Sequence, residues 1–157
     1  MPDTLVIRLP AMVNHPVEWV RISAGNGNPG EVQSGSLEMA APIAASCKVI
    51  VLAPSTHVLR VSTQIPLSGT ARIRQSLPYA LEEQLAGDVE SQHFACGPKD
   101  SQGFVPVAVV ERERLSGWLE QLREHQVVPA AVYAESDALP GAPATMTVLV
   151  DSEQAII

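Results

Sequence analysis

The chain has 157 residues, of which 46% are hydrophobic and 17% charged, and its formal net charge is −7. This composition excludes an intrinsically disordered chain, which needs low hydrophobicity and high charge. The acidic balance also argues against nucleic acid as a partner, because there is no basic excess to displace counterions from phosphates. We therefore expect one globular domain, or one and a half small ones, with an aliphatic core.

The first third of the chain has the pattern of short strands joined by turns. Three runs have strand character, the last of them polar: residues 4–9, 17–22 and 31–36. Residues 37–45 are alanine-rich and weakly helical, with Pro42 limiting the helix. The nearly continuous apolar run at residues 48–53 predicts a strand that is covered on both faces.

A strand over residues 58–65 and a helix follow. Ile73, Leu77, Ala80, Leu81 and Leu85 recur at helical spacing, which predicts one buried stripe. Because Pro78 lacks a backbone donor and crowds the preceding turn, we expect a kink or a late helix start. We expect Gly87 to end the helix.

The second half alternates strands and a helix. Residues 104–110 predict a strand, and Pro106 favours an edge position or a bulge there. Residues 112–125 predict a helix whose sheet-facing side carries Leu115, Trp118, Leu119 and Leu122. The remaining apolar runs predict short strands, the last returning after a turn at residues 151–153: residues 127–133, 145–150 and 155–157.

Several motifs have simple structural interpretations. Gly25-x-Gly27-x-x-Gly30 matches a dinucleotide fingerprint in letters, but a strand-like segment follows it where a helix is required, so we expect a turn. The four histidines are far apart and show no metal-ligand spacing. Cys47 and Cys96 are expected to be free thiols in a reducing compartment, although one disulfide is formally possible.

The sequence also bears on whether this stretch of chain carries a signal peptide or a membrane span. The N-terminus lacks the basic region of a signal peptide, and no run approaches the roughly 18 apolar residues of a membrane span. We therefore expect that this stretch of chain carries no signal peptide and spans no membrane.

A cluster of carboxylates follows the first strong helix: Glu82, Glu83, Asp88 and Glu90. Neighbouring helix positions point about 100° apart, so Glu82 and Glu83 do not converge on one atom for acid–base chemistry. Two interpretations stay open, a solvated acidic face and a surface for docking another protein.

The run Ser76–Ala95, SLPYALEEQLAGDVESQHFA, resembles the signature of the type II secretion system protein L family. Ser76 departs from the usual alanine. Three further segments are also similar to this family: residues 49–66, residues 107–119, and the short strand with Pro129 that is followed by Glu135 and Leu139-Pro140. The resemblance therefore covers most of the chain.

The resemblance implies an actin-like, RNase H-like α/β fold with a mixed sheet and flanking helices. Residues 1–143 are expected to be the first part of the cytoplasmic actin-like region, folded as one unit or as two subdomains. Residues 144–157 are expected to be the start of the next lobe, which is truncated. The family implies a non-enzymatic component without a cofactor, located on the cytoplasmic side of the bacterial inner membrane. A transmembrane helix and a periplasmic domain would follow.

The same resemblance implies partners. The amino-terminal domain of the secretion ATPase is expected to bind the cytoplasmic part. Their charge, rather than the resemblance, makes Glu82, Glu83, Asp88 and Glu90 the expected partner-binding residues. Protein M of the same system would pair with the membrane and periplasmic part, and a homodimer stays open.

Two rival functions can be weighed against the residues. A nucleotide-binding, actin-like pilus-assembly protein would need Asp-x-Gly turns facing the phosphates, but Leu9-Pro10-Ala11 follows the first strand and Asp151-Ser152-Glu153 lacks the glycine. An RNase H-like hydrolase or transferase would need carboxylates converging on Mg²⁺, and residues 4–9 and 48–53 contain none.

Overall fold

The computed structural model describes residues 1–141, 145–150 and 155–156. The chain forms two compact units: residues 1–56 with 120–157, and residues 57–119. The second unit is therefore one continuous segment of sequence inserted between the two parts of the first. The predicted boundary between residues 143 and 144 stays a prediction.

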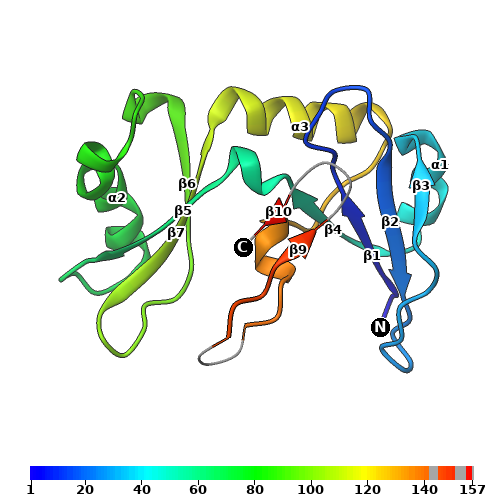
Figure 1. The fold of residues 1–157 in the computed structure, drawn as a ribbon, viewed down its shortest axis with the longest axis horizontal. Coiled ribbons are helices and arrows are strands. Elements are labelled where there is room, and N and C mark those ends of the chain that lie inside the picture. The colour runs from blue at the N-terminus through cyan, green and yellow to red at the C-terminus, as the bar shows by residue number, and fades with distance from the viewer. Residues whose placement is uncertain (142–144, 151–154, 157) are drawn as a thin grey trace. The chain divides into compact units, whose positions relative to one another are not determined.

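The first unit is built on a five-stranded mixed sheet with the strand order β3-β2-β1-β4-β8 (Figure 1). Strand β4 pairs parallel with both β1 and β8, whereas β1, β2 and β3 are antiparallel neighbours. Helix α1 (Leu37–Ala44) lies in the connection from β3 to β4. The strands are β1 (Thr4–Arg8), β2 (Val17–Ile22), β3 (Gln33–Gly35), β4 (Lys48–Ala53) and β8 (Ala131–Ala134).

The centre of one face of this sheet is buried. The register pairs Ile7 with Trp19 on one side and with Val51 on the other, and all three side chains are buried. On the opposite face Ile50 and Leu52 are only half-buried. The expectation that residues 48–53 are covered on both faces is therefore wrong, because an apolar run alone does not reveal how many layers cover a sheet.

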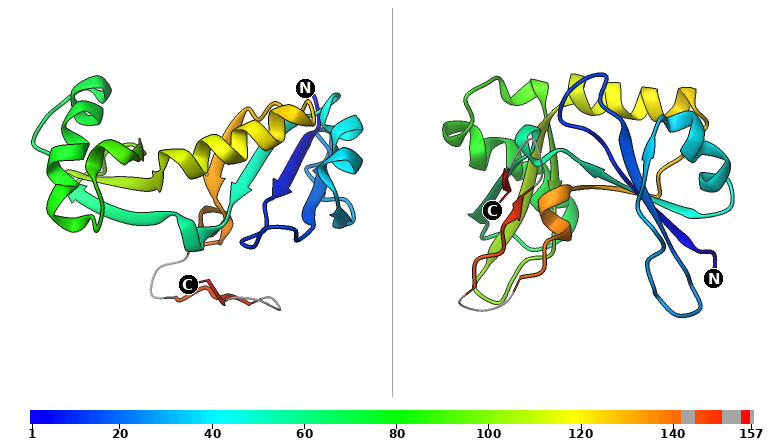
Figure 2. Two further views of the ribbon diagram at one scale, coloured as in Figure 1. Left: turned by 90° about the horizontal axis from the view of Figure 1, so that it is seen from above. Right: turned by 45° about the vertical axis from the view of Figure 1, so that its right-hand side comes forward.

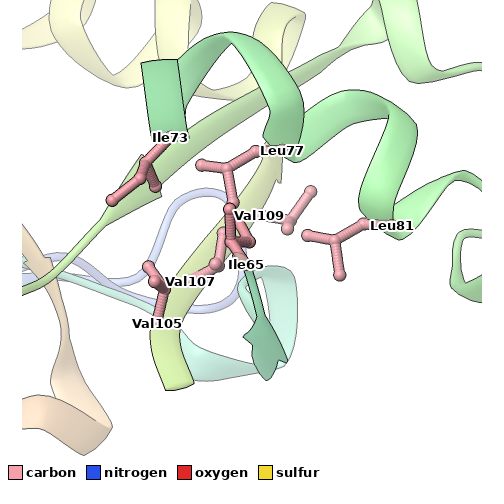
Figure 3. Packing of buried hydrophobic residues seen from close by; sticks show 7 residues of the cluster. All are labelled: Ile65, Ile73, Leu77, Leu81, Val105, Val107 and Val109. Carbon is pink, nitrogen blue, oxygen red and sulfur yellow. The ribbon is translucent and has the colours of Figure 1, made fainter. Parts of the chain in front are cut away.

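The second unit is a three-stranded antiparallel sheet with one helix packed on it. The strand order is β5-β7-β6, with β5 (Leu59–Gln64), β6 (Gln92–Cys96) and β7 (Phe104–Glu111). Helix α2 (Thr70–Leu81) covers one face. Figure 3 shows the seven buried residues of this core: Ile65, Ile73, Leu77, Leu81, Val105, Val107 and Val109.

Helix α2 differs from the predicted helix at both ends. It begins at Thr70 despite Pro78, so a late start is wrong, and its α-helical part ends at Leu81 rather than at Gly87. A 3-10 turn, η2 (Glu82–Gln84), continues the chain, and Leu85 beyond it is half-buried. Ala80 is exposed, so only part of the predicted stripe is in the core.

Pro106 lies in the central strand of its sheet, so the predicted edge position is wrong. Its register partner on β5 is Ser62, and the pairing runs on either side of it without a bulge. The carbonyl of Pro106 accepts from the Gly97 amide at 2.9 Å, so its nitrogen faces the same side, just past the end of β6 at Cys96. The N–H that Pro106 lacks would therefore point past the end of strand β6, where it interrupts no hydrogen bond of the β6–β7 pairing.

Helix α3 (Arg112–Glu124) matches its predicted span closely, but its burial is uneven. Leu122 is fully buried, whereas Leu115, Trp118 and Leu119 are half-buried. Of the four residues predicted to form the core-facing side of this helix, only Leu122 is therefore fully buried.

The end of the chain forms a small antiparallel pair. Strand β9 (Leu149–Val150) pairs with β10 (Ala155–Ile156), which confirms the predicted return. The predicted turn at Asp151-Ser152-Glu153 lies outside the described residues. In the portion of the chain that can be described, no helix combines the length and the apolar character that a membrane crossing requires.

Candidate interaction surface

The predicted acidic cluster lies on the turns that follow α2. Glu82 and Glu83 belong to η2, Asp88 precedes the next 3-10 turn, η3 (Val89–Ser91), and Glu90 lies within it. All four side chains are exposed. We call Glu82, Glu83, Asp88 and Glu90 the acidic surface; their role in binding a partner stays a prediction.

Asp88 has a local structural reason to be acidic. Its Oδ1 accepts a hydrogen bond from the Glu90 amide at 3.1 Å, and its carbonyl accepts from the Ser91 hydroxyl at 2.6 Å. A side-chain acceptor at this position satisfies an amide that the start of a helical turn leaves free. Asp88 is therefore a cap as well as a surface charge.

The three glutamates differ from Asp88 in this respect. Across the described residues, no ion pair or side-chain hydrogen bond involves the carboxylates of Glu82, Glu83 or Glu90. Arg72 and Arg74, the cations that the sequence offers nearby, form no ion pair with them there. Within the described residues, the carboxylates of these three glutamates are therefore not neutralised by an ion pair.

Of the two basic side chains Arg112 and His93, only Arg112 adds positive charge beside the acidic surface. The Arg112 Nε donates to the backbone carbonyl of Glu90 at 3.0 Å, which places one guanidinium next to η3. Burial, and then the charge of Arg112, lower the pKa of His93, so its imidazole is neutral at pH 7 and offsets no acidic charge.

The first unit contains a buried ion pair that the sequence patterns do not reveal. Glu135 is 2% exposed and follows β8, and its Oε2 accepts from the Nε of Arg8 at the end of β1 at 2.7 Å. Its Oε1 accepts from the Ser55 amide, just after β4, at 3.0 Å. Arg8 also bonds Glu18, 2.9 Å away on β2.

This cluster lies at the carboxyl ends of the parallel strands β1, β4 and β8. Open α/β sheets bind their ligands at that edge. Here Arg8 and Glu135 bond each other across 127 positions of sequence, and the Ser136 amide bonds the Ser55 hydroxyl at 2.9 Å. The only sequence signal for this ion pair is the position of Glu135 directly after a strand. Its partners lie too far away in the sequence for the contacts to be predicted.

The glycine motif is a turn, as predicted. It joins β2 to β3 and projects beyond the strand ends (Figure 2). Gly27 has a φ of +67°, and its amide donates to the Ser23 carbonyl at 2.9 Å, while the Gly30 amide donates to Arg21 at 2.8 Å. No helix follows Gly30 within the described chain before α1, so the helix that a pyrophosphate site requires is not placed after the third glycine.

A groove of about 390 Å³ lies between α1 and the residues that end α3. Two carboxylates and an imidazole border it, from Glu38, Glu124 and His125. Among the residues that the structure describes, no three His, Cys, Asp or Glu side chains form a group that could hold a metal ion. The arrangement suggests no particular chemistry in this groove.

The family model for protein L of the type II secretion system matches residues 5–156. The chain belongs to this family. A protein L from Dickeya chrysanthemi is 34% identical over 142 residues, and one from Pseudomonas aeruginosa is 39% identical over 88 residues. The alignments cover 88% and 56% of this chain but only 35% and 23% of those relatives, so the chain spans about a third or less of their length.

Solved structures resemble this member of the protein L family in fold. The cytoplasmic domain of EpsL, an inner-membrane component of the type II secretion system of Vibrio cholerae, superposes with a TM-score of 0.78 at 24% identity, covering 90% of this chain and 60% of that one. The PilM–PilN type IV pilus biogenesis complex gives 0.61 at 17% identity, covering 84% and 47%. These likenesses confirm the predicted α/β fold class, a mixed sheet with flanking helices.

Proposed function

We propose that this part of the protein L chain is a non-enzymatic adaptor that recruits the secretion ATPase to the cytoplasmic face of the bacterial inner membrane. Membership of the family over residues 5–156 is the observation that carries the proposal, because it places the chain in a secretion machine. The full-length protein would pair with protein M through its membrane and periplasmic part.

The acidic surface is the docking site that we propose for the amino-terminal domain of the ATPase. Glu83 and Glu90 are exposed and take part in no ion pair within the described ranges, so they can meet a basic patch without first breaking an internal contact. Charges at the rim of an interface act mainly on the association rate and on specificity. This predicts a partner surface rich in lysine or arginine.

The test is a pulldown and a kinetic binding measurement with the amino-terminal domain of the cognate ATPase. The double variant Glu83→Lys/Glu90→Lys should associate about tenfold more slowly at low salt, and the difference should shrink as salt screens the charges. Glu31→Lys/Glu120→Lys is the matched control, because it makes the same charge change at two exposed glutamates of the first unit.

The fold of the double variant should survive, since exposed charges contribute little to stability. Association of the folded double variant at the wild-type rate and affinity would exclude the acidic surface as the docking site. Loss of ATPase binding in both variants would instead indicate a general effect of net charge.

A further inference from the structure

The glycine-rich turn between β2 and β3 contains a chemically labile sequence. Asparagine is one of the residues that degrade in proteins, because the backbone nitrogen of the next residue can attack its side-chain carbonyl. The three asparagines of this chain are exposed, and they differ in the residue that follows them: Asn14-His15, Asn26-Gly27 and Asn28-Pro29.

Of these three, only Asn26 is followed by a residue that leaves the attack unhindered. Pro29 has no backbone N–H, so Asn28 lacks an attacking group, and the side chain of His15 crowds the nitrogen that follows Asn14. Gly27 has no side chain. Among the described residues, no atom beyond its immediate neighbours lies within 4 Å of the place that a Cβ would occupy.

The folded turn also polarises the side-chain carbonyl of Asn26. Its Oδ1 accepts a hydrogen bond from the backbone amide of Asn28 at 3.1 Å. A donor in this position stabilises the negative charge that develops on the oxygen when the Cγ carbon is attacked. The backbone of residue 28 therefore activates the side chain of residue 26.

One contact has to open before the reaction. The Gly27 amide donates to the Ser23 carbonyl at 2.9 Å, which occupies the attacking group. The contact lies in an exposed turn that projects beyond the strand ends, where local opening costs little free energy (Figure 2). Because the Asn26 Cγ and the Gly27 nitrogen are held together by the chain itself, ring closure then needs only bond rotation.

We propose that Asn26 is a site of spontaneous deamidation. The Gly27 nitrogen forms a bond to the Asn26 Cγ, the Cγ–Nδ2 bond breaks, and the amide proton of Gly27 leaves with the Nδ2 group as ammonia. The product is a cyclic succinimide, which water opens in two ways. Addition of water at Cγ gives aspartate, and addition at the backbone carbonyl carbon gives isoaspartate, in which the main chain runs through Cγ.

The two products affect the turn differently. Both add one negative charge to the first unit. Aspartate keeps the main chain and an oxygen that can accept from the Asn28 amide, so the turn is retained. Isoaspartate adds a methylene group to the main chain inside the loop that the Ser23 amide closes on the Asn28 carbonyl at 3.2 Å, and it should weaken that contact.

The test is incubation of the purified 157-residue chain at mildly alkaline pH, followed by tryptic digestion and mass spectrometry. Cleavage after arginine and lysine places Asn14 in residues 9–21 and the other two asparagines in residues 22–48, where fragmentation separates them. Asn26 should convert at least about tenfold faster than Asn14, because only Asn26 precedes a residue without a side chain. Asn28 should keep its amide. Protein isoaspartate methyltransferase should label the isoaspartate product at position 26.

The turn offers a matched pair of glycine variants. Gly27→Ala should slow the reaction at Asn26 at least about tenfold, because the new methyl group crowds the attacking nitrogen. Gly25→Ala adds the same methyl group on the other side of Asn26, where the nearest atom is the Ser23 Oγ at 3.9 Å, and should leave the rate unchanged.

The wild-type chain alone can overturn the proposal, whatever the variants do to the turn. An Asn26 that keeps its amide throughout the incubation, or that converts no faster than Asn14, would do so. Conversion of Asn26 at the wild-type rate in Gly27→Ala would also contradict it. Deamidation at Asn26 does not depend on ATPase docking, because Asn26 lies in the first unit and the acidic surface in the second.

Discussion

At the scale of single residues, the Arg8–Glu135 pair is a contact whose loss should lower stability strongly. We predict that Glu135→Ala lowers the free energy of unfolding by about 3 kcal/mol, because it removes the acceptor of both the Arg8 Nε and the Ser55 amide in a buried place. Urea unfolding monitored by Trp19, which is buried in β2, measures the first unit if Trp118 is first replaced by phenylalanine.

Glu18→Ala is the internal control for this prediction. Glu18 bonds the same guanidinium, but its side chain is 45% exposed, so its removal should cost less than about 1 kcal/mol. Equal costs for the two variants would mean that burial gives the Glu135 contact no advantage.

At the scale of elements, burial along α3 predicts a graded response. Leu122→Ala should cost about 2–5 kcal/mol, because it opens a cavity around a fully buried side chain. Leu119→Ala should cost distinctly less, since Leu119 is half-buried and its surroundings already include solvent. Chemical denaturation measures the free energy of unfolding of both variants. An equal or larger loss for Leu119→Ala would contradict the burial that the structure describes.

The elements also show what sequence patterns can and cannot reveal. Alternation located β2 and the apolar run located β4 to the residue, because both patterns of apolar side chains are typical of strands. The same reasoning failed at Pro106, since a pattern does not tell which neighbour a missing donor faces. It also missed the cap at Asp88, which depends on the conformation of one turn.

The sequence likewise predicted only part of the candidate site. The exposure of Glu83 and Glu90 follows from their polarity and their place after the buried stripe of α2. The pairing of Arg8 with Glu135 could not be foreseen, because 127 residues separate the two and only the fold brings the ends of β1 and β8 together.

At the scale of the whole molecule, charge is divided unevenly between the units. The first unit's segments of sequence hold ten acidic residues and four basic ones, whereas the second unit's hold seven and six. A polyphosphate approaching the first unit therefore meets a repulsive field. The residues after β1, Leu9-Pro10-Ala11, also lack the glycine turn that would cradle a phosphate.

We therefore predict that Mg²⁺-ATP at millimolar concentration leaves the melting temperature unchanged. A ligand that binds only the native state must stabilise it, so thermal-shift measurements detect binding directly. Mg²⁺ without nucleotide is the control. A rise of several degrees with Mg²⁺-ATP alone would favour the nucleotide-binding alternative for this part of the chain.

The insertion of one unit into the sequence of the other has a consequence for the order of events during synthesis. Residues 57–119 are continuous, so every residue of the second unit has been synthesised before β8 is made. The sheet of the first unit, in contrast, lacks an edge strand until residue 134 is added, and Arg8 lacks its buried carboxylate until residue 135. The sheet that begins with the strands made first is thus completed only after the whole second unit has been synthesised.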